Sequence, residues 1–199
     1  MTRNIRLTAG ILIAITGAAL IQTALAARAQ EQLDDAAAPI TYNIEATDDG
    51  SIIVLETIEI NAPVTRVWAA YTTAEGYQSW AAPVASVDLR PGGRIRTSYD
   101  AEAGLDGDAV NTLKIVNYVP HRLLTLQAEV SDNWPDVLKR DADNLYNVIL
   151  FDDLGDDRTR VTSYGLGYSD TPELRRMMQF FEQNNQMLYK KLIDAVERE

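Results

Sequence analysis

Cysteine is absent from the 199 residues, and histidine occurs only once, as His121. The lack of cysteine excludes disulfide bonds, a thiol nucleophile and a thiolate metal site. A single histidine excludes a histidine-based metal cluster within one chain, and a Ser-His-Asp arrangement would have to recruit His121 from the turn after Pro120. We therefore predict no metal and no cofactor, so any catalysis would depend on carboxylates, tyrosines and amides.

Basic residues are also scarce, because 18 Lys and Arg stand against 29 Asp and Glu, giving a net charge of −11. Nucleic acids and anionic membrane surfaces attract basic patches, so this balance argues against both as partners. Arg3, Arg6 and Arg28 all lie in the first 29 residues, which contain no acid. The remainder carries 15 basic and 29 acidic residues, a net charge of −14, which mainly favours solubility.

One long apolar run, residues 7–25, follows the positive Arg3 and Arg6 and is typical of a signal peptide. The small-residue pattern at 27–29 predicts cleavage before Gln30, and residues 24–26 offer a second site. Alternatively, residues 7–25 remain as a membrane anchor, because the run approaches the ~20 residues that span a bilayer. Both alternatives predict an exported domain, periplasmic or extracellular, with membrane contact only through this segment.

After a polar, Ala-rich tether at residues 30–40, we predict one domain over residues 41–199. Residues 41–60 have strand character, and the apolar residues Ile52, Val54, Ile58 and Ile60 share a parity with Glu56. Alternation therefore predicts that Glu56 points inward. The alternative is a bulge or a shift at Gly50-Ser51 that would expose this carboxylate.

Two short helices follow, over residues 64–71 and 74–80, and their aromatic residues include Trp68, Tyr71 and Trp80. A meander of antiparallel strands is predicted next, over residues 84–89, 94–99, 110–119, 122–130, 146–152 and 158–168. Residues 131–144 interrupt it, either as a solvated connection held by Trp134 or as a short helix over the mouth of the fold. The element order predicts an α+β domain.

A long helix is predicted over residues 170–199, capped by Asp170 or Thr171 with Pro172 in the first turn. Its apolar stripe consists of Leu174, Met177, Phe181, Leu188, Leu192 and Ala195. Asn184 and Asn185 interrupt this stripe. An unpaired buried amide costs roughly 1–3 kcal/mol, so we expect the sheet, a water or a ligand to supply a partner.

Several segments resemble SRPBCC (START-like, Bet v 1-like) domains, specifically the branch similar to the activator of Hsp90 ATPase homologue family (AHSA1-like). The opening is carried by Ile60-Asn61-Ala62-Pro63-Val64, Val67-Trp68-Ala69-Ala70 and Glu75-Gly76-Tyr77 up to Trp80. The later marks are Val87-Asp88-Leu89-Arg90-Pro91-Gly92-Gly93, Tyr118-Val119-Pro120-His121-Arg122-Leu123 and Arg158-Thr159-Arg160-Val161-Thr162. Together these segments cover about residues 51–196.

The resemblance implies a helix-grip fold, in which a curved antiparallel sheet of about seven strands wraps a long C-terminal helix and leaves a cavity. Such domains typically hold lipids or other apolar molecules, and some catalyse ring closures. We expect the cavity to be lined by Glu56, Trp68, Tyr71, Trp80, Leu126, Tyr164, Met177, Phe181, Asn184, Asn185 and Leu188.

Three functions remain open from the sequence. The first is an exported protein that binds an apolar small molecule or lipid. The second is a cyclase or isomerase in which Glu56 acts as general base, because an inward carboxylate has a raised pKa. The third is an interaction protein whose cavity is closed. The predicted export segment argues against a role in activating Hsp90.

Overall fold

The computed structural model describes residues 40–106, 110–132 and 134–198. The predicted signal peptide and nearly all of the predicted tether lie outside these residues. The first half of the domain contains β1 (Thr41–Ala46), β2 (Ser51–Ile60), α2 (Val64–Thr72), α3 (Ala74–Trp80), β3 (Val84–Val87) and β4 (Arg94–Ser98). The second half contains β5 (Asn111–Val119), β6 (Leu123–Glu129), α4 (Asp136–Lys139), the 3-10 turn η1 (Ala142–Asn144), β7 (Tyr146–Gly155), β8 (Arg158–Ser169) and α5 (Pro172–Glu197).

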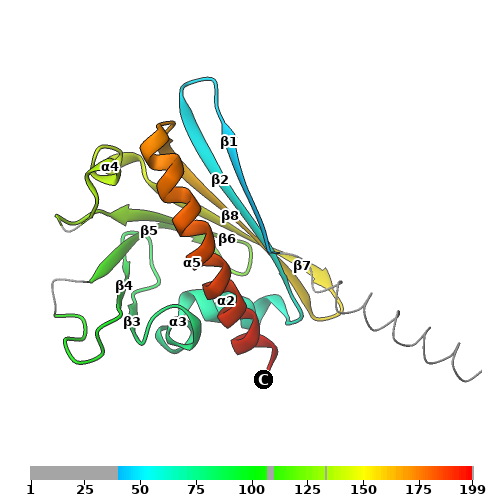
Figure 1. Ribbon diagram of the computed structural model, residues 1–199. Coiled ribbons are helices and arrows are strands. Elements are labelled where there is room, and N and C mark those ends of the chain that lie inside the picture. The colour runs from blue at the N-terminus through cyan, green and yellow to red at the C-terminus, as the bar shows by residue number, and fades with distance from the viewer. Residues whose placement is uncertain (1–39, 107–109, 133, 199) are drawn as a thin grey trace, which may run out of the picture. The chain divides into compact units, whose positions relative to one another are not determined.

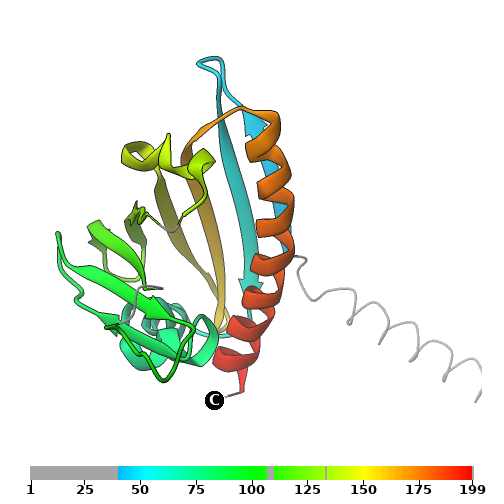
Figure 2. The same cartoon turned by 60° about the vertical axis from the view of Figure 1, so that its left-hand side comes forward.

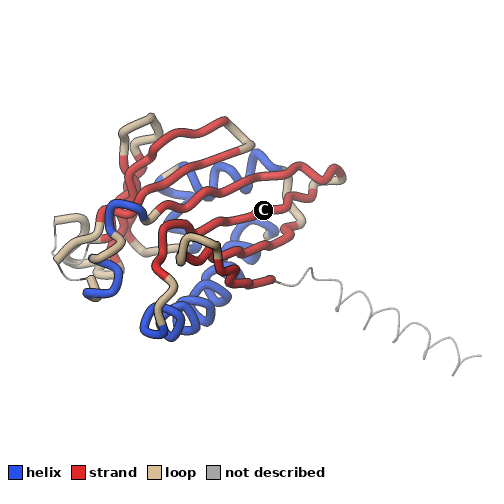
Figure 3. Tube along the Cα trace, turned by 90° about the horizontal axis from the view of Figure 1, so that it is seen from above, coloured by secondary structure: helices blue, strands red, loops and turns tan. Residues whose placement is uncertain are grey.

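The strands form one antiparallel sheet in the order β1-β2-β8-β7-β6-β5-β4-β3. Strands β1 and β3 are its two edges, so the sheet is open (Figure 3). The predicted α+β helix-grip fold is confirmed. The sheet has eight strands instead of about seven because residues 41–60 fold as the hairpin β1–β2, whose turn ends at Gly50 with a φ of +82°.

Helix α5 runs along one face of the sheet (Figures 1 and 2). Its N-cap is Thr171, whose hydroxyl accepts a hydrogen bond from the backbone N–H of Leu174 at 3.2 Å. The buried side chains of α5 are Leu174, Met178, Tyr189, Leu192 and Val196. The predicted stripe was therefore partly wrong, because Met177, Phe181, Leu188 and Ala195 are only half-buried.

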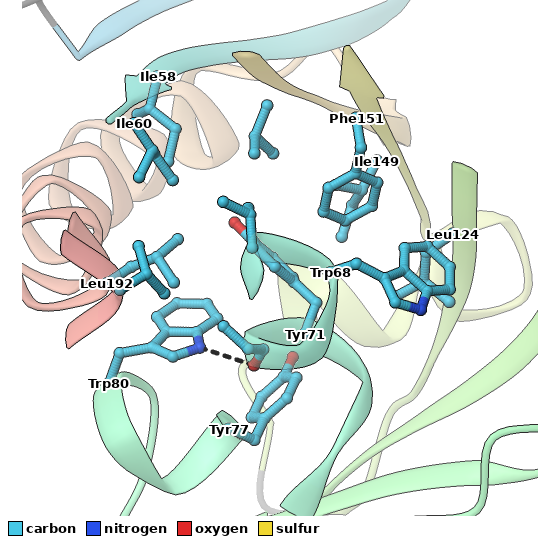
Figure 4. Close-up of a cluster of buried hydrophobic side chains, with 14 of the residues drawn as sticks. Ile58, Ile60, Trp68, Tyr71, Tyr77, Trp80, Leu124, Ile149, Phe151 and Leu192 are labelled. Atoms are coloured by element: carbon cyan, nitrogen blue, oxygen red, sulfur yellow. Dashed lines mark hydrogen bonds between the residues drawn. The ribbon is translucent and has the colours of Figure 1, made fainter. Parts of the chain in front are cut away.

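Two hydrophobic clusters flank the middle of α5. The larger one joins α2 and α3 to the C-terminal half of α5, and includes Ile58 and Ile60 of β2 (Figure 4). Within it, the indole N–H of Trp80 donates to the carbonyl of Ala70 at 3.0 Å. The smaller cluster joins α4 to the N-terminal half of α5, and includes Ile52 and Val54 of β2. Between the two clusters, β2 contributes Glu56.

The segment 131–144 forms the short helix α4 and the turn η1, so the second of its two predicted alternatives is the one observed. Val137 and Leu138 are each 2% exposed and pack against α5 and β2. The buried carboxylate of Asp141 accepts hydrogen bonds from the backbone N–H and the hydroxyl of Ser169, at 2.9 and 2.7 Å. These contacts fix the segment to the end of β8.

The length of α5 alone does not make it a membrane span, because charged residues recur along it. Within the described ranges, no helix combines the length and the apolar character needed to cross a bilayer.

Candidate functional site: a buried carboxylate between two cavities

Glu56 lies on the buried side of β2, whose residues alternate strictly between half-buried and buried. The pairing of β2 with β8 shifts between Ile52 and Val54, yet Val54, Glu56 and Ile58 all keep the buried parity. Glu56 is 6% exposed. The prediction that this carboxylate points inward is confirmed, and the alternative of an exposed Glu56 is wrong.

Two side chains of α5 hold the carboxylate. Asn185 Nδ2 donates to Glu56 Oε1 at 2.9 Å, and the Tyr189 hydroxyl donates to Oε2 at 2.8 Å. Glu56 of the sheet is therefore the hydrogen-bond partner that the amide of Asn185 requires. Sequence analysis missed Tyr189, although its position one turn after Asn185 places both on one face of a helix. Asn184 instead donates to the carbonyl of Phe180 at 3.0 Å.

The surroundings raise the pKa of Glu56. Burial is the main cause, because it removes hydration from the charged form, and the negative charge of Glu182 adds to it. The hydrogen bonds from Asn185 and Tyr189 act in the opposite direction but do not cancel the effect of burial. The pKa of Tyr189 is also raised, first by burial and then by Glu56, so its hydroxyl stays protonated and remains a donor.

Two cavities meet at Glu56. The first, here called the α4 cavity, has a volume of about 220 Å³ and is bounded by Trp134 and Leu138 on the side of α4. The second, here called the α3 cavity, has a volume of about 160 Å³ and is bounded by Tyr71, Tyr77 and Trp80. Both cavities are lined by Glu56, Leu113, Leu126, Asn147, Ser163 and Asn185.

A larger groove of about 830 Å³ lies outside the α4 cavity. This surface groove shares Trp134, Leu138, Phe181 and Asn185 with the α4 cavity, so the two adjoin. Phe180 and Met187 also line the groove, and they are 63% and 57% exposed. The groove is therefore an exposed, mainly apolar surface next to the cavity that Glu56 lines.

The structure distributes the predicted cavity residues over these three spaces. Glu56, Leu126, Phe181 and Asn185 line the α4 cavity. The α3 cavity is lined by Glu56, Tyr71, Trp80, Leu126, Asn185 and Leu188. The surface groove is lined by Met177, Phe181, Asn184, Asn185 and Leu188.

Two predicted cavity residues line none of these spaces. Trp68 is in the larger hydrophobic cluster, where its ring lies against Phe151 with 5.2 Å between centroids. Tyr164 follows the buried Ser163 on β8, and because successive side chains of a strand point to opposite faces, it lies on the other face of the sheet. Neither side chain borders these three spaces, since neither an aromatic side chain nor strand character alone determines the face on which a residue lies.

The described ranges contain no cluster of three His, Asp or Glu side chains placed to hold a metal ion.

An open antiparallel sheet that packs on a long C-terminal helix, with cavities between them, defines a helix-grip domain, the fold that the resemblance to SRPBCC domains implies. The chain belongs to the family described as "Activator of Hsp90 ATPase homolog 1-like protein", whose sequence pattern matches residues 61–197. This confirms the predicted resemblance. A comparison with curated proteins finds no match.

Solved structures share the fold at low sequence identity. The Aha1 dimer from Colwellia psychrerythraea is 17% identical with a TM-score of 0.57, and the match covers 73% of this chain and 96% of that one. Protein MLL2253 from Mesorhizobium loti is 19% identical with a TM-score of 0.56, covering 73% and 97%. Protein Ms6760 from Mycobacterium smegmatis is 22% identical with a TM-score of 0.52, covering 80% and 96%.

Proposed function

We propose that this protein binds a small, mainly apolar molecule that carries at least one polar group. The observation that carries the proposal is the position of Glu56, held by Asn185 and Tyr189 where the two cavities meet. Ligand sites are commonly apolar pockets with a few oriented polar groups, which is the composition found here. The SRPBCC fold commonly binds hydrophobic ligands, and this supports the proposal at the level of the fold.

The surface groove supplies the entrance in this proposal. A ligand would pass Phe180 and Met187, cross beneath Trp134 and Leu138, and place its polar group at Glu56. Burial of apolar surface contributes about 25 cal/mol per Å², so each apolar part of the ligand that is buried in the bound state adds to its affinity.

The proposal also places binding outside the cytoplasm. Its support is the sequence of residues 1–29, with Arg3 and Arg6 ahead of the apolar run and the small-residue pattern before Gln30. Determination of the N-terminal residue of the protein purified from its own cells tests this part. A mature chain beginning near Gln30 supports export, whereas an intact Met1 favours the retained anchor.

Native mass spectrometry of the protein purified from its own cells, followed by solvent extraction, tests the binding function. We expect an apolar compound to copurify. An empty protein that also fails to bind a panel of apolar fluorescent probes would overturn the proposal, and would favour an interaction protein that acts through its acidic surface.

A second candidate function is an isomerase or cyclase in which Glu56 removes a proton from the bound molecule. The raised pKa of a carboxyl group that borders both cavities favours it. Incubation of the extracted ligand with protein in D2O distinguishes the two candidates. A general base introduces deuterium, and Glu56→Gln abolishes the exchange, whereas a binding protein introduces none.

A further inference from the structure

The charged lining of the two cavities is limited to one acidic side chain. Glu56 is the only Asp, Glu, Lys, Arg or His that borders the α4 cavity or the α3 cavity, as far as the described residues extend. The remaining polar lining consists of tyrosine, asparagine and serine side chains together with Trp80 and Trp134. Lys191 borders the surface groove but neither cavity. A ligand in the cavities therefore meets a carboxyl group and no cation.

The hydrogen bonds of Glu56 leave acceptor capacity unused. An ionised carboxylate has about four lone-pair sites, and Asn185 and Tyr189 occupy one on each oxygen. Both donors come from the α5 side and both are uncharged, so the charge of the carboxylate has no counter-ion in these contacts. Buried charges in proteins are generally paired, so the site lacks a cation.

We infer that the cavities select a cationic ligand, an apolar amine whose ammonium group pairs with Glu56, and that they exclude anionic ligands such as fatty acids. This inference rests on the proposed binding function and narrows its ligand class. An ammonium group has three donors and no acceptor, which complements the free lone pairs of the carboxylate. A ligand carboxylate would instead face Glu56 with nothing in the cavities to neutralise either charge.

The inference makes binding depend on pH. The groups that face Glu56 are Glu182 and Tyr189 of α5, Tyr42 of β1, Tyr71 of α2 and Tyr168 of β8. The tyrosines stay neutral because their pKa values are all raised, that of Tyr168 to about 12. An ammonium group favours ionised Glu56, so amine affinity should increase as the pH rises through the raised pKa, with release of a proton on binding.

Calorimetric titration of the full chain with octylamine, 1-octanol and octanoate tests this inference, because the three probes share one alkyl chain and differ in charge. At pH 7.5 we expect octylamine to bind at least tenfold more tightly than 1-octanol, and octanoate to bind at least tenfold more weakly than 1-octanol. Octylamine remains protonated between pH 5 and 8, as lysine does, so a gain in its affinity over that range reports on the protein.

Glu56→Gln should remove the preference for octylamine over 1-octanol while 1-octanol still binds. The exposed Glu45 on β1 provides the matched control, because Glu45→Gln makes the same change of charge away from the cavities and should keep the preference. The comparison of the three probes on the unaltered protein tests the inference even if Glu56→Gln fails to fold.

Equal affinity for the three probes, or tighter binding of octanoate, would overturn this inference and leave the binding function intact. A preference for octylamine that survives Glu56→Gln would also overturn it, because the preference would then come from the acidic surface. Failure of all three probes to bind would instead count against the proposed binding function and the inference together.

Discussion

At the scale of single residues, Glu56 imposes a cost on folding that changes with pH. Burial raises its pKa above the ordinary value of 4.5, so between the two values the folded protein holds more protons than the unfolded chain. The free energy of unfolding therefore falls as the pH rises from 4.5 through the raised pKa, because ionising the buried Glu56 opposes folding. Each unit by which the pKa is raised corresponds to about 1.4 kcal/mol.

Glu56→Gln should remove this dependence, because glutamine does not ionise. We expect the variant to gain stability relative to the unaltered protein between pH 4.5 and pH 8. Urea unfolding at both pH values measures the difference, with Glu45→Gln as the exposed control. A difference between Glu56→Gln and the unaltered protein that is the same at both pH values would contradict the raised pKa.

Tyr189→Phe removes the hydroxyl that donates to Glu56 Oε2 and leaves the ring in place. We expect a loss of about 1–3 kcal/mol in the free energy of unfolding, because a buried carboxyl group loses one of its hydrogen-bond partners. Chemical denaturation measures it, and Tyr99→Phe is the control since Tyr99 is 65% exposed. If Tyr189→Phe costs no more in the background of Glu56→Gln than Tyr99→Phe does, the loss belongs to the Glu56 contact.

At the scale of elements, the alternation of apolar residues along β2 predicted that Glu56 points inward. Four apolar residues of one parity bury that face of the strand, and Glu56 is buried with them because a strand cannot reverse a single side chain without a bulge. The sequence could not show that Tyr189 holds the carboxylate. The two residues are 133 positions apart, and they meet only because α5 packs against β2.

The rotation of α5 about its own axis explains why its predicted apolar stripe was partly wrong. A stripe of apolar residues is wide enough to allow several rotations of the helix, and Met177 and Met178 are equally apolar. In the observed rotation Asn185 and Tyr189 face Glu56, Met178 is buried and Met177 borders the surface groove. Apolar periodicity alone does not count such polar contacts, so it could not distinguish this rotation of the helix from its neighbours.

Gly167 of β8 determines how closely the segment 131–144 approaches the sheet. Its φ is +85°, and a Cβ placed there would lie 1.7 Å from the carbonyl oxygen of Asn144. Gly50 has a similar φ of +82° with no atom within 4 Å of such a Cβ. The two glycines thus share backbone strain on substitution, and only Gly167 adds a clash.

We expect Gly50→Ala to cost about 1–2 kcal/mol from the left-handed backbone alone. Gly167→Ala should cost at least about 2 kcal/mol more, because η1 must move away from β8. Urea denaturation compares the two, and hydrogen exchange of residues 136–144 should accelerate only in the second. Equal costs would mean that η1 yields freely and does not fix the distance between the segment 131–144 and β8.

At the scale of the whole folded domain, the two hydrophobic clusters carry the stability and the space between them carries the proposed function. Proteins often retain a cavity at some cost in stability, so a substitution that fills it tends to stabilise the fold and impair function. Ala128 of β6 borders the α4 cavity and packs against the smaller cluster. A larger apolar side chain at this position would occupy space that a ligand needs.

We therefore expect Ala128→Leu to raise the free energy of unfolding by about 0.5–2 kcal/mol and to weaken the binding of 1-octanol at least tenfold. Ala46→Leu is the control, since Ala46 is exposed on β1 and the added side chain fills no cavity. Thermal unfolding and calorimetric titration measure the two effects on the same samples. Unchanged 1-octanol affinity in a stabilised Ala128→Leu protein would place the ligand outside the α4 cavity, and would leave the α3 cavity and the surface groove as the remaining sites.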